Sequence, residues 1–80
     1  MKIKVIAFGI AKDILRAKEL EFEMNPGDTI SVLRNTLIQR HPEFTKLKSF
    51  SFAVGVNYQD DAYSLNENDE VVIIPPVSGG

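Results

Sequence analysis

Apolar and polar residues alternate along two early segments, residues 2–9 and 18–24, and this period of two predicts β-strands. In the first segment one face is apolar and the other is mixed: the apolar face holds Ile3, Val5 and Ala7, and the mixed face holds Lys2, Lys4, Ile6 and Phe8. The second segment divides cleanly into Leu20, Phe22 and Met24 on one face and Glu19, Glu21 and Glu23 on the other. The first strand is therefore expected at the centre of a sheet, and the second is expected to have one face in water. Residues 11–16 between them are expected to form a short helical turn or a loop.

A single substantial helix is predicted from residue 30 to about residue 41. The preceding Asn25-Pro26-Gly27-Asp28 is a turn signal, because proline presets φ and glycine accepts positive φ. Asp28 or Thr29 can then cap the helix. Its apolar stripe has the spacing i, i+3, i+7 and i+8, formed by Ile30, Leu33, Leu37 and Ile38. Pro42 is expected to end the helix.

The second half of the chain predicts more strands. After an exposed linker at residues 46–49, apolar residues alternate over residues 50–56, which predicts a strand. Residues 57–61 are polar and turn-like, residues 62–65 are expected to form a short edge strand, and residues 65–69 form a second turn with Asn68 in a left-handed conformation. Residues 70–74 form a continuous β-branched apolar run, typical of a strand covered on both faces.

This order of elements, β-β-α-β-(β)-β, predicts an α+β protein with a β-grasp (ubiquitin-like) fold. The simplest closed arrangement is a mixed sheet of four or five strands with one main helix on one face, and with the first and last strands central and parallel. We expect one domain over residues 1–74 and a flexible C-terminal tail over residues 75–80.

Composition excludes several classes of protein. The 80 residues contain no cysteine, which excludes disulfides, cysteine-based zinc sites and a catalytic thiol, and favours the cytoplasm. The net charge of −2 argues against nucleic-acid binding, and no apolar run is long enough to span a membrane.

Candidate catalytic side chains are few. His41, the single histidine, sits at the predicted helix end, where an imidazole interacts well with the last carbonyls. Asp60 and Asp61 are adjacent, so on an extended chain they point to opposite sides and do not share a metal or a proton. The glutamates of residues 19–23 form either an acidic docking stripe or simply the wet face of the sheet. There is no phosphate-binding loop and no predicted metal site, so we expect no catalysis by the chain's own side chains.

The last six residues, Pro75-Pro76-Val77-Ser78-Gly79-Gly80, point to a different chemistry. Two prolines favour a stiff, extended segment that leaves the last strand. Fully extended, the six residues reach at most about 20 Å. Two glycines make a backbone thin enough for a narrow channel, and Gly80 presents a carboxylate there. Activation as an acyl-adenylate would allow that carboxylate to accept sulfur or to be joined to an amine.

Several short segments carry a family resemblance along the whole chain: Lys4-Val5-Ile6-Ala7-Phe8, Asp28-Thr29-Ile30 with Leu33-Arg34, Val56-Asn57, Asp69-Glu70-Val71 and the final Pro-Pro-Val-x-Gly-Gly. On these motifs the chain resembles the MoaD-type small subunit of molybdopterin synthase, within the ubiquitin-like sulfur-carrier family. The sequence departs from the family at Asn68, where glycine is frequent.

The resemblance implies a non-catalytic sulfur-carrier subunit. An adenylating enzyme would use ATP to activate the Gly80 carboxylate, and a sulfur donor would convert it to a thiocarboxylate. The large, catalytic subunit would then take up the tail, so that sulfur passes to cyclic pyranopterin monophosphate in molybdenum cofactor biosynthesis. The synthase would be a heterotetramer, and the chain would bind no cofactor of its own.

The resemblance also assigns roles to tail and body residues. Gly80 would carry the sulfur and Gly79 would keep the tail slim, while Pro75, Pro76, Val77 and Ser78 would line the inserted arm. Phe8 and Ile74 match family positions at the subunit interface, although core packing is the alternative for both. Two other functions stay open: a sulfur carrier for thiamine or another pathway, and a ubiquitin-like modifier or binding module.

Overall fold

A computed structural model describes residues 1–47 and 49–76 of the chain. The elements follow one another as β1 (Lys2–Ala7), α1 (Gly9–Leu15), β2 (Glu19–Glu23), α2 (Ile30–Arg40), the 3₁₀ helix η1 (Pro42–Lys46), β3 (Ser51–Val54), β4 (Asn57–Gln59) and β5 (Glu70–Ile74). The predicted strands at the two ends of the chain and the main helix are confirmed, and residues 11–16 lie largely in a helix, α1, rather than a loop.

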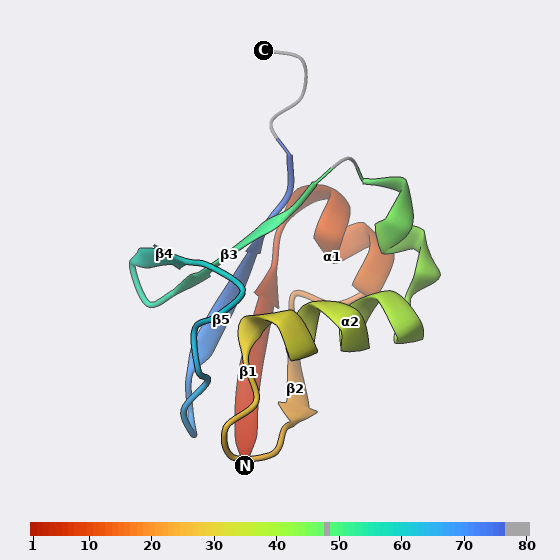
Figure 1. Cartoon of the computed structure of the whole chain (residues 1–80). Helices are drawn as coiled ribbons and strands as arrows, with labels where there is room; N and C mark the ends of the chain where they lie inside the picture. Colours follow the sequence, from red (N-terminus) through yellow and green to blue (C-terminus); the bar gives the residue numbers. More distant parts are fainter. Residues whose placement is uncertain (48, 77–80) are drawn as a thin grey trace.

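The strands form one mixed sheet in the order β2-β1-β5-β3-β4. The two central strands, β1 and β5, are parallel, with Val5 opposite Val71, and their other neighbours are antiparallel. Parallel neighbours need a long crossover connection, and here it includes α2, which crosses one face of the sheet (Figure 1). This is the β-grasp arrangement expected from the sequence.

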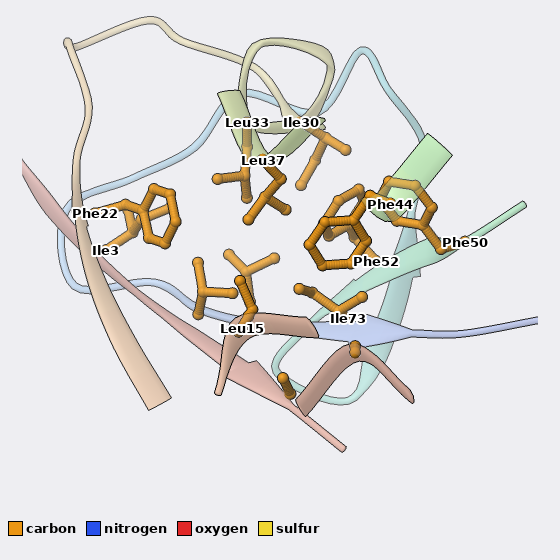
Figure 2. Close-up of a cluster of buried hydrophobic side chains, with 14 of the residues drawn as sticks. Ile3, Leu15, Phe22, Ile30, Leu33, Leu37, Phe44, Phe50, Phe52 and Ile73 are labelled. Atoms are coloured by element: carbon orange, nitrogen blue, oxygen red, sulfur yellow. The ribbon is translucent and has the colours of Figure 1, made fainter. Parts of the chain in front are cut away.

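The core fills the space between the helices and one face of the sheet. Three residues of the predicted helix stripe, Ile30, Leu33 and Leu37, are at 0% exposure, and these side chains point from α2 towards the sheet (Figure 2). The fourth, Ile38, is half-buried and packs against the core. The face of β1 predicted to be apolar is buried as well, because Ile3, Val5 and Ala7 are at most 1% exposed. We call this the core face, and the opposite side of the sheet the outer face.

The helix α2 begins in an unexpected way. Thr29 is its N-cap residue but makes no side-chain capping bond, and the Asp28 carboxylate accepts a hydrogen bond from the Asn25 N–H instead. The free N–H groups of the first turn are satisfied by a loop: Ile30 N–H donates to the Tyr63 carbonyl at 3.0 Å, and Ser31 N–H to the Asp61 carbonyl at 3.1 Å. The backbone of residues 61–63 therefore caps this helix.

The edge strand lies earlier than expected. Gly55 has φ +65° and, with Val56, makes a two-residue turn that brings Asn57 back opposite Val54. Glycine at the first central position is typical of hairpin turns. The prediction of one strand over residues 50–56 was therefore too long, because Val56 is in the turn and 95% exposed.

Residues 57–61 were wrongly expected to form only a turn, since β4 occupies Asn57–Gln59. Residues 62–65, expected as the edge strand, contribute only an isolated bridge between Ser64 and Thr29. The second turn is confirmed: Asn68 has φ +69°, and its N–H donates to the Lys2 carbonyl at 2.9 Å.

Sequence periodicity missed the helix η1. Pro42 ends α2 as predicted, but it also starts this short 3₁₀ helix, in which proline at the first position costs no hydrogen bond. The helix inserts Phe44 into the core at 0% exposure, with its ring centroid 5.2 Å from that of Phe50. Across residues 1–47 and 49–76, no helix has both the length and the apolarity that crossing a membrane requires.

Replacing Phe44 with alanine tests this packing. Phe44→Ala is expected to lower the free energy of unfolding by about 3–5 kcal/mol, because it removes a buried ring and leaves a cavity. Urea denaturation followed by circular dichroism measures the change. Val32→Ala is the control, because Val32 is 39% exposed on α2 and should cost less than about 1 kcal/mol. Equal losses in the two variants would contradict the core role of Phe44.

Candidate functional site

The last strand delivers the chain to one end of the sheet. β5 ends at Ile74, opposite Ser51 of β3, at the end of the molecule remote from Met1 (Figure 1). Pro75 and Pro76 follow outside the sheet and are half-buried. The remaining predicted tail residues, Val77, Ser78, Gly79 and Gly80, lie outside the described residues. Their predicted roles, and the division of the chain into body and tail, therefore stay predictions.

A row of apolar residues crosses the outer face of the sheet. Ile6 of β1 is opposite Val72 of β5, Val72 is opposite Ala53 of β3, and Ala53 is opposite Tyr58 of β4. Cross-strand partners share a face, and Val5, Val71 and Phe52, which alternate with members of the row in β1, β5 and β3, are in the core. The row therefore lies on the side of the sheet that the core does not use.

Phe8 and Ile74 extend this row towards the start of the tail. Phe8 continues the alternation of β1 in an extended conformation and is 51% exposed, so the alternative that it packs in the core is wrong. Ile74 is half-buried and alternates with the buried Ile73. We call the combined surface the outer apolar patch; it consists of Ile6, Phe8, Ala53, Tyr58, Val72 and Ile74. Ala53 lies in the row by register but is itself only 7% exposed.

The exposure of the outer apolar patch shows that one prediction, about β5, was wrong. The continuous apolar run of β5 was expected to be covered on both faces, but only Val71 and Ile73 are buried, while Val72 and Ile74 are half-buried. The helices α1 and α2 and the helix η1 contribute Ile14, Leu33 and Phe44 to the core on the other face. Within the described residues, no helix or strand covers the apolar surface on the outer face of the central strands. Exposed apolar patches of this kind often mark binding sites.

Arg34 connects the main helix, α2, to Phe50 immediately before β3 and to Asp61 in the loop after β4. Its Nη1 donates to the Phe50 carbonyl at 2.7 Å, and its Nε and Nη2 donate to Asp61 Oδ1 at 3.3 Å and 2.9 Å. The guanidinium also lies 4.8 Å and 5.1 Å from the ring centroids of Phe50 and Phe52. Since Ser51, the next residue after Phe50, pairs with Ile74, this contact fixes the strand next to the start of the tail.

The other candidate residues from the sequence, His41, Asp60 and Asp61, make local contacts within the fold. His41 is the C-cap residue of α2, its N–H donates to the Leu37 carbonyl at 2.8 Å, and its ring meets that of Phe44 edge-on. Asp60 and Asp61 have separate partners, as expected, because Asp60 accepts from the Ala62 N–H and Asp61 from Arg34. Across residues 1–47 and 49–76, no three acidic or histidine side chains come close enough to hold a metal ion.

Comparison with known proteins decides the family. A family model described as the ThiS family matches residues 5–80. The chain belongs to the ThiS family. A curated relative, the molybdopterin synthase sulfur carrier subunit of Chlamydomonas reinhardtii, is 35% identical over 100% of both chains. The recognition of a sulfur-carrier resemblance from the sequence is thereby confirmed.

Two solved structures share the fold of this ThiS-family chain. A putative molybdopterin converting factor subunit 1 from Pyrococcus furiosus has a TM-score of 0.86 at 24% identity, covering 96% of this chain and 99% of that one. The second is a chain from a protein–protein complex of subunits 1 and 2 of the molybdopterin-converting factor from Helicobacter pylori. It has a TM-score of 0.70 at 22% identity, with 100% coverage of both chains.

The contacts of Arg34 can be separated by two substitutions in this ThiS-family protein. Arg34→Gln is expected to lower the free energy of unfolding by about 1.5–3 kcal/mol, because it removes a charged hydrogen bond to a partly buried carbonyl. Asp61→Asn is expected to cost less than about 1 kcal/mol, because that ion pair is exposed to solvent. Chemical denaturation of both variants measures the difference. Equal costs would show that the ion pair, rather than the Phe50 carbonyl, accounts for the effect of Arg34.

Proposed function

We propose that this chain is the sulfur-carrier subunit of a molybdopterin synthase and that the carboxylate of Gly80 carries the sulfur. Two observations support the proposal. Curated relatives from Chlamydomonas reinhardtii and Arabidopsis thaliana, 35% and 30% identical over the whole of this chain, are named as that subunit. The outer apolar patch is a surface that a partner subunit can cover, and it adjoins the start of the Gly-Gly tail.

The chemistry of this role takes place at the tail rather than in a cleft. A carboxylate is a poor electrophile, so an adenylating enzyme joins it to AMP from ATP with release of pyrophosphate. Sulfide-level sulfur (HS⁻) then attacks the acyl carbon, the bond to AMP breaks and AMP leaves, and a thiocarboxylate remains at Gly80. Because the reactive group is the backbone terminus, the chain needs no catalytic side chain of its own. Its relatives are accordingly named as carrier subunits.

Of these two observations, the one from the structure that carries the proposal is the position of the outer apolar patch. Phe8 and Ile74 lie at the end of the sheet where the chain leaves it, and six residues from Pro75 reach at most about 20 Å. A partner seated on the patch therefore has its own active site within range of Gly80. We propose the large subunit as that partner and cyclic pyranopterin monophosphate as the molecule that receives sulfur there. Two carrier chains would flank a dimer of large subunits in a heterotetramer.

Each proposed tail residue has a steric role. Gly79 has no side chain, which keeps the arm narrow, and Ser78 is small. Pro75 and Pro76 disfavour any return of the chain towards the sheet, and Val77 supplies an apolar contact in the partner's channel.

One added residue tests the chemistry at Gly80. A variant with alanine appended after Gly80 is expected to gain no sulfur when incubated with ATP, a sulfide source and the matching adenylating enzyme. The unmodified chain should gain the mass of sulfur replacing oxygen, located at Gly80 by fragmentation. Intact-mass spectrometry measures both, and thermal unfolding should be the same for the two. Sulfur transfer to the extended chain would rule out the carboxylate of Gly80 as the reacting group.

Substitution of Phe8 tests the patch. Phe8→Asp is expected to weaken binding of the large subunit at least about tenfold, because it places a charge in an interface that must be dry. Stability should be retained, since residue 8 is the N-cap of α1, where aspartate is favoured. Val32→Asp is the control, because it adds the same charge to the exposed side of α2. Calorimetric titration measures both affinities, and equal affinities would show that the large subunit binds elsewhere. A chain that gains sulfur but does not bind the large subunit would be a carrier for another pathway.

A further inference from the structure

The charged residues of the sheet are confined to one part of its outer face. Six residues of the five strands are charged, and the alternation of each strand places all of them on the outer face: Lys2, Lys4, Glu19, Glu21, Glu23 and Glu70. The strands β3 and β4 contain no charged residue. We call this group the charged half of the outer face; it covers β2 and the beginnings of β1 and β5, away from the tail.

Register places the charged half directly against the outer apolar patch. Lys4 is opposite both Glu21 and Glu70, and one step nearer to the tail Ile6 is opposite Glu19. The row of apolar residues therefore ends in the carboxylate of Glu19 at the β2 edge. Lys4 Nζ lies 3.9 Å from carboxylate oxygens of both Glu19 and Glu70. These contacts are long, and the Lys4 side chain is 41% exposed, so they leave the excess of negative charge available to a partner.

The charged half accounts for the net charge of the chain. Its four glutamates and two lysines give −2, and the side chains of the whole sequence, 11 acidic and 9 basic, also give −2. The Met1 ammonium, 3.3 Å from Glu23 Oε2, offsets one of these charges at the far end of β2, opposite Lys2. The remaining seven acidic and seven basic residues cancel. On the outer face of the sheet, the negative charge of Glu19, Glu21 and Glu70 thus lies beside the outer apolar patch and on the side away from Ile74. Such an arrangement steers association and sets orientation more than it adds affinity.

We propose that the partner surface covering the outer apolar patch has lysine or arginine side chains along the margin that faces β2. This inference rests on the proposed function and specifies the chemistry of the large subunit at that interface. A surface that is apolar near the tail and acidic at the opposite side fits such a partner in one rotation only. In that rotation the tail is directed towards the partner's active site. In the reverse rotation the acidic residues lie against the entrance of the site that receives the Gly80 carboxylate.

Paired neutralisations test the inference with net charge held equal. Glu19→Gln/Glu21→Gln removes two charges from the charged half, and Glu43→Gln/Glu67→Gln removes two from η1 and from the loop before β5. Both variants have a formal net charge of zero, and the amides keep the size of the side chains. Stopped-flow association with the large subunit is measured at low salt and at physiological salt, using the wild type carrying its thiocarboxylate as reference.

The first variant is expected to associate about three- to tenfold more slowly at low salt and to lose most of its salt dependence. The second should stay within about twofold of the wild type, because its charges lie outside the proposed interface. Equal rates for both variants, or equal slowing in both, would overturn the inference while leaving the carrier function intact. A wild type that gains sulfur at Gly80 but does not bind the large subunit would overturn it as well. A wild type that never gains sulfur would instead contradict the proposed function.

Discussion

The parallel pairing of β1 with β5 is the constraint on which the other features depend. It joins residues near the two ends of the chain, with Val5 opposite Val71, and the 65 residues between them must be accommodated around this central pair. Closing so long a loop costs entropy, and that cost is offset by the burial of Val5, Val71 and their neighbours at 0–1% exposure. The remaining strands are added on either side, and α2 crosses the face that they share.

The same pairing gives the sheet two different faces. Because β1 and β5 are central, alternation places five of their apolar residues on the core face and three, Ile6, Val72 and Ile74, on the outer face. The five form the centre of the core, and the three, together with Phe8, form most of the outer apolar patch. Apolar surface left exposed on the central strands lowers the free energy of unfolding, and the stability margin of a domain of this size is already small. A partner that covers Phe8 and Ile74 would recover that free energy on binding, so the fold and the proposed docking surface have one origin.

Periodicity predicted most of the fold because the longer elements are each apolar on one side. It failed where a single residue overrides the period. Gly55 turns the chain within what looked like one strand, so that Val56 lies at the tip of a hairpin. Phe44 lies in a 3₁₀ helix too short to show a period, yet it is fully buried. The continuous run of β5 was interpreted as covered on both faces, because a sequence does not distinguish a surface covered by the same chain from one left for a partner.

The tail motif and the residues proposed for the interface, Phe8 and Ile74, could be identified from the sequence, whereas their position relative to the charged residues of the sheet could not. Glu19, Glu21 and Glu23 could be assigned to one face of a strand, but only the register shows that Glu19 ends the apolar row at Ile6. This placement matters for a carrier. A segment of six residues keeps Gly80 within about 20 Å of Ile74 in any conformation, and it does not determine the direction in which the body is turned. The orientation of the body on its partner therefore has to be set by the sheet. Two unlike surfaces at a fixed spacing, here the outer apolar patch and the charged half, are the minimum that defines an orientation.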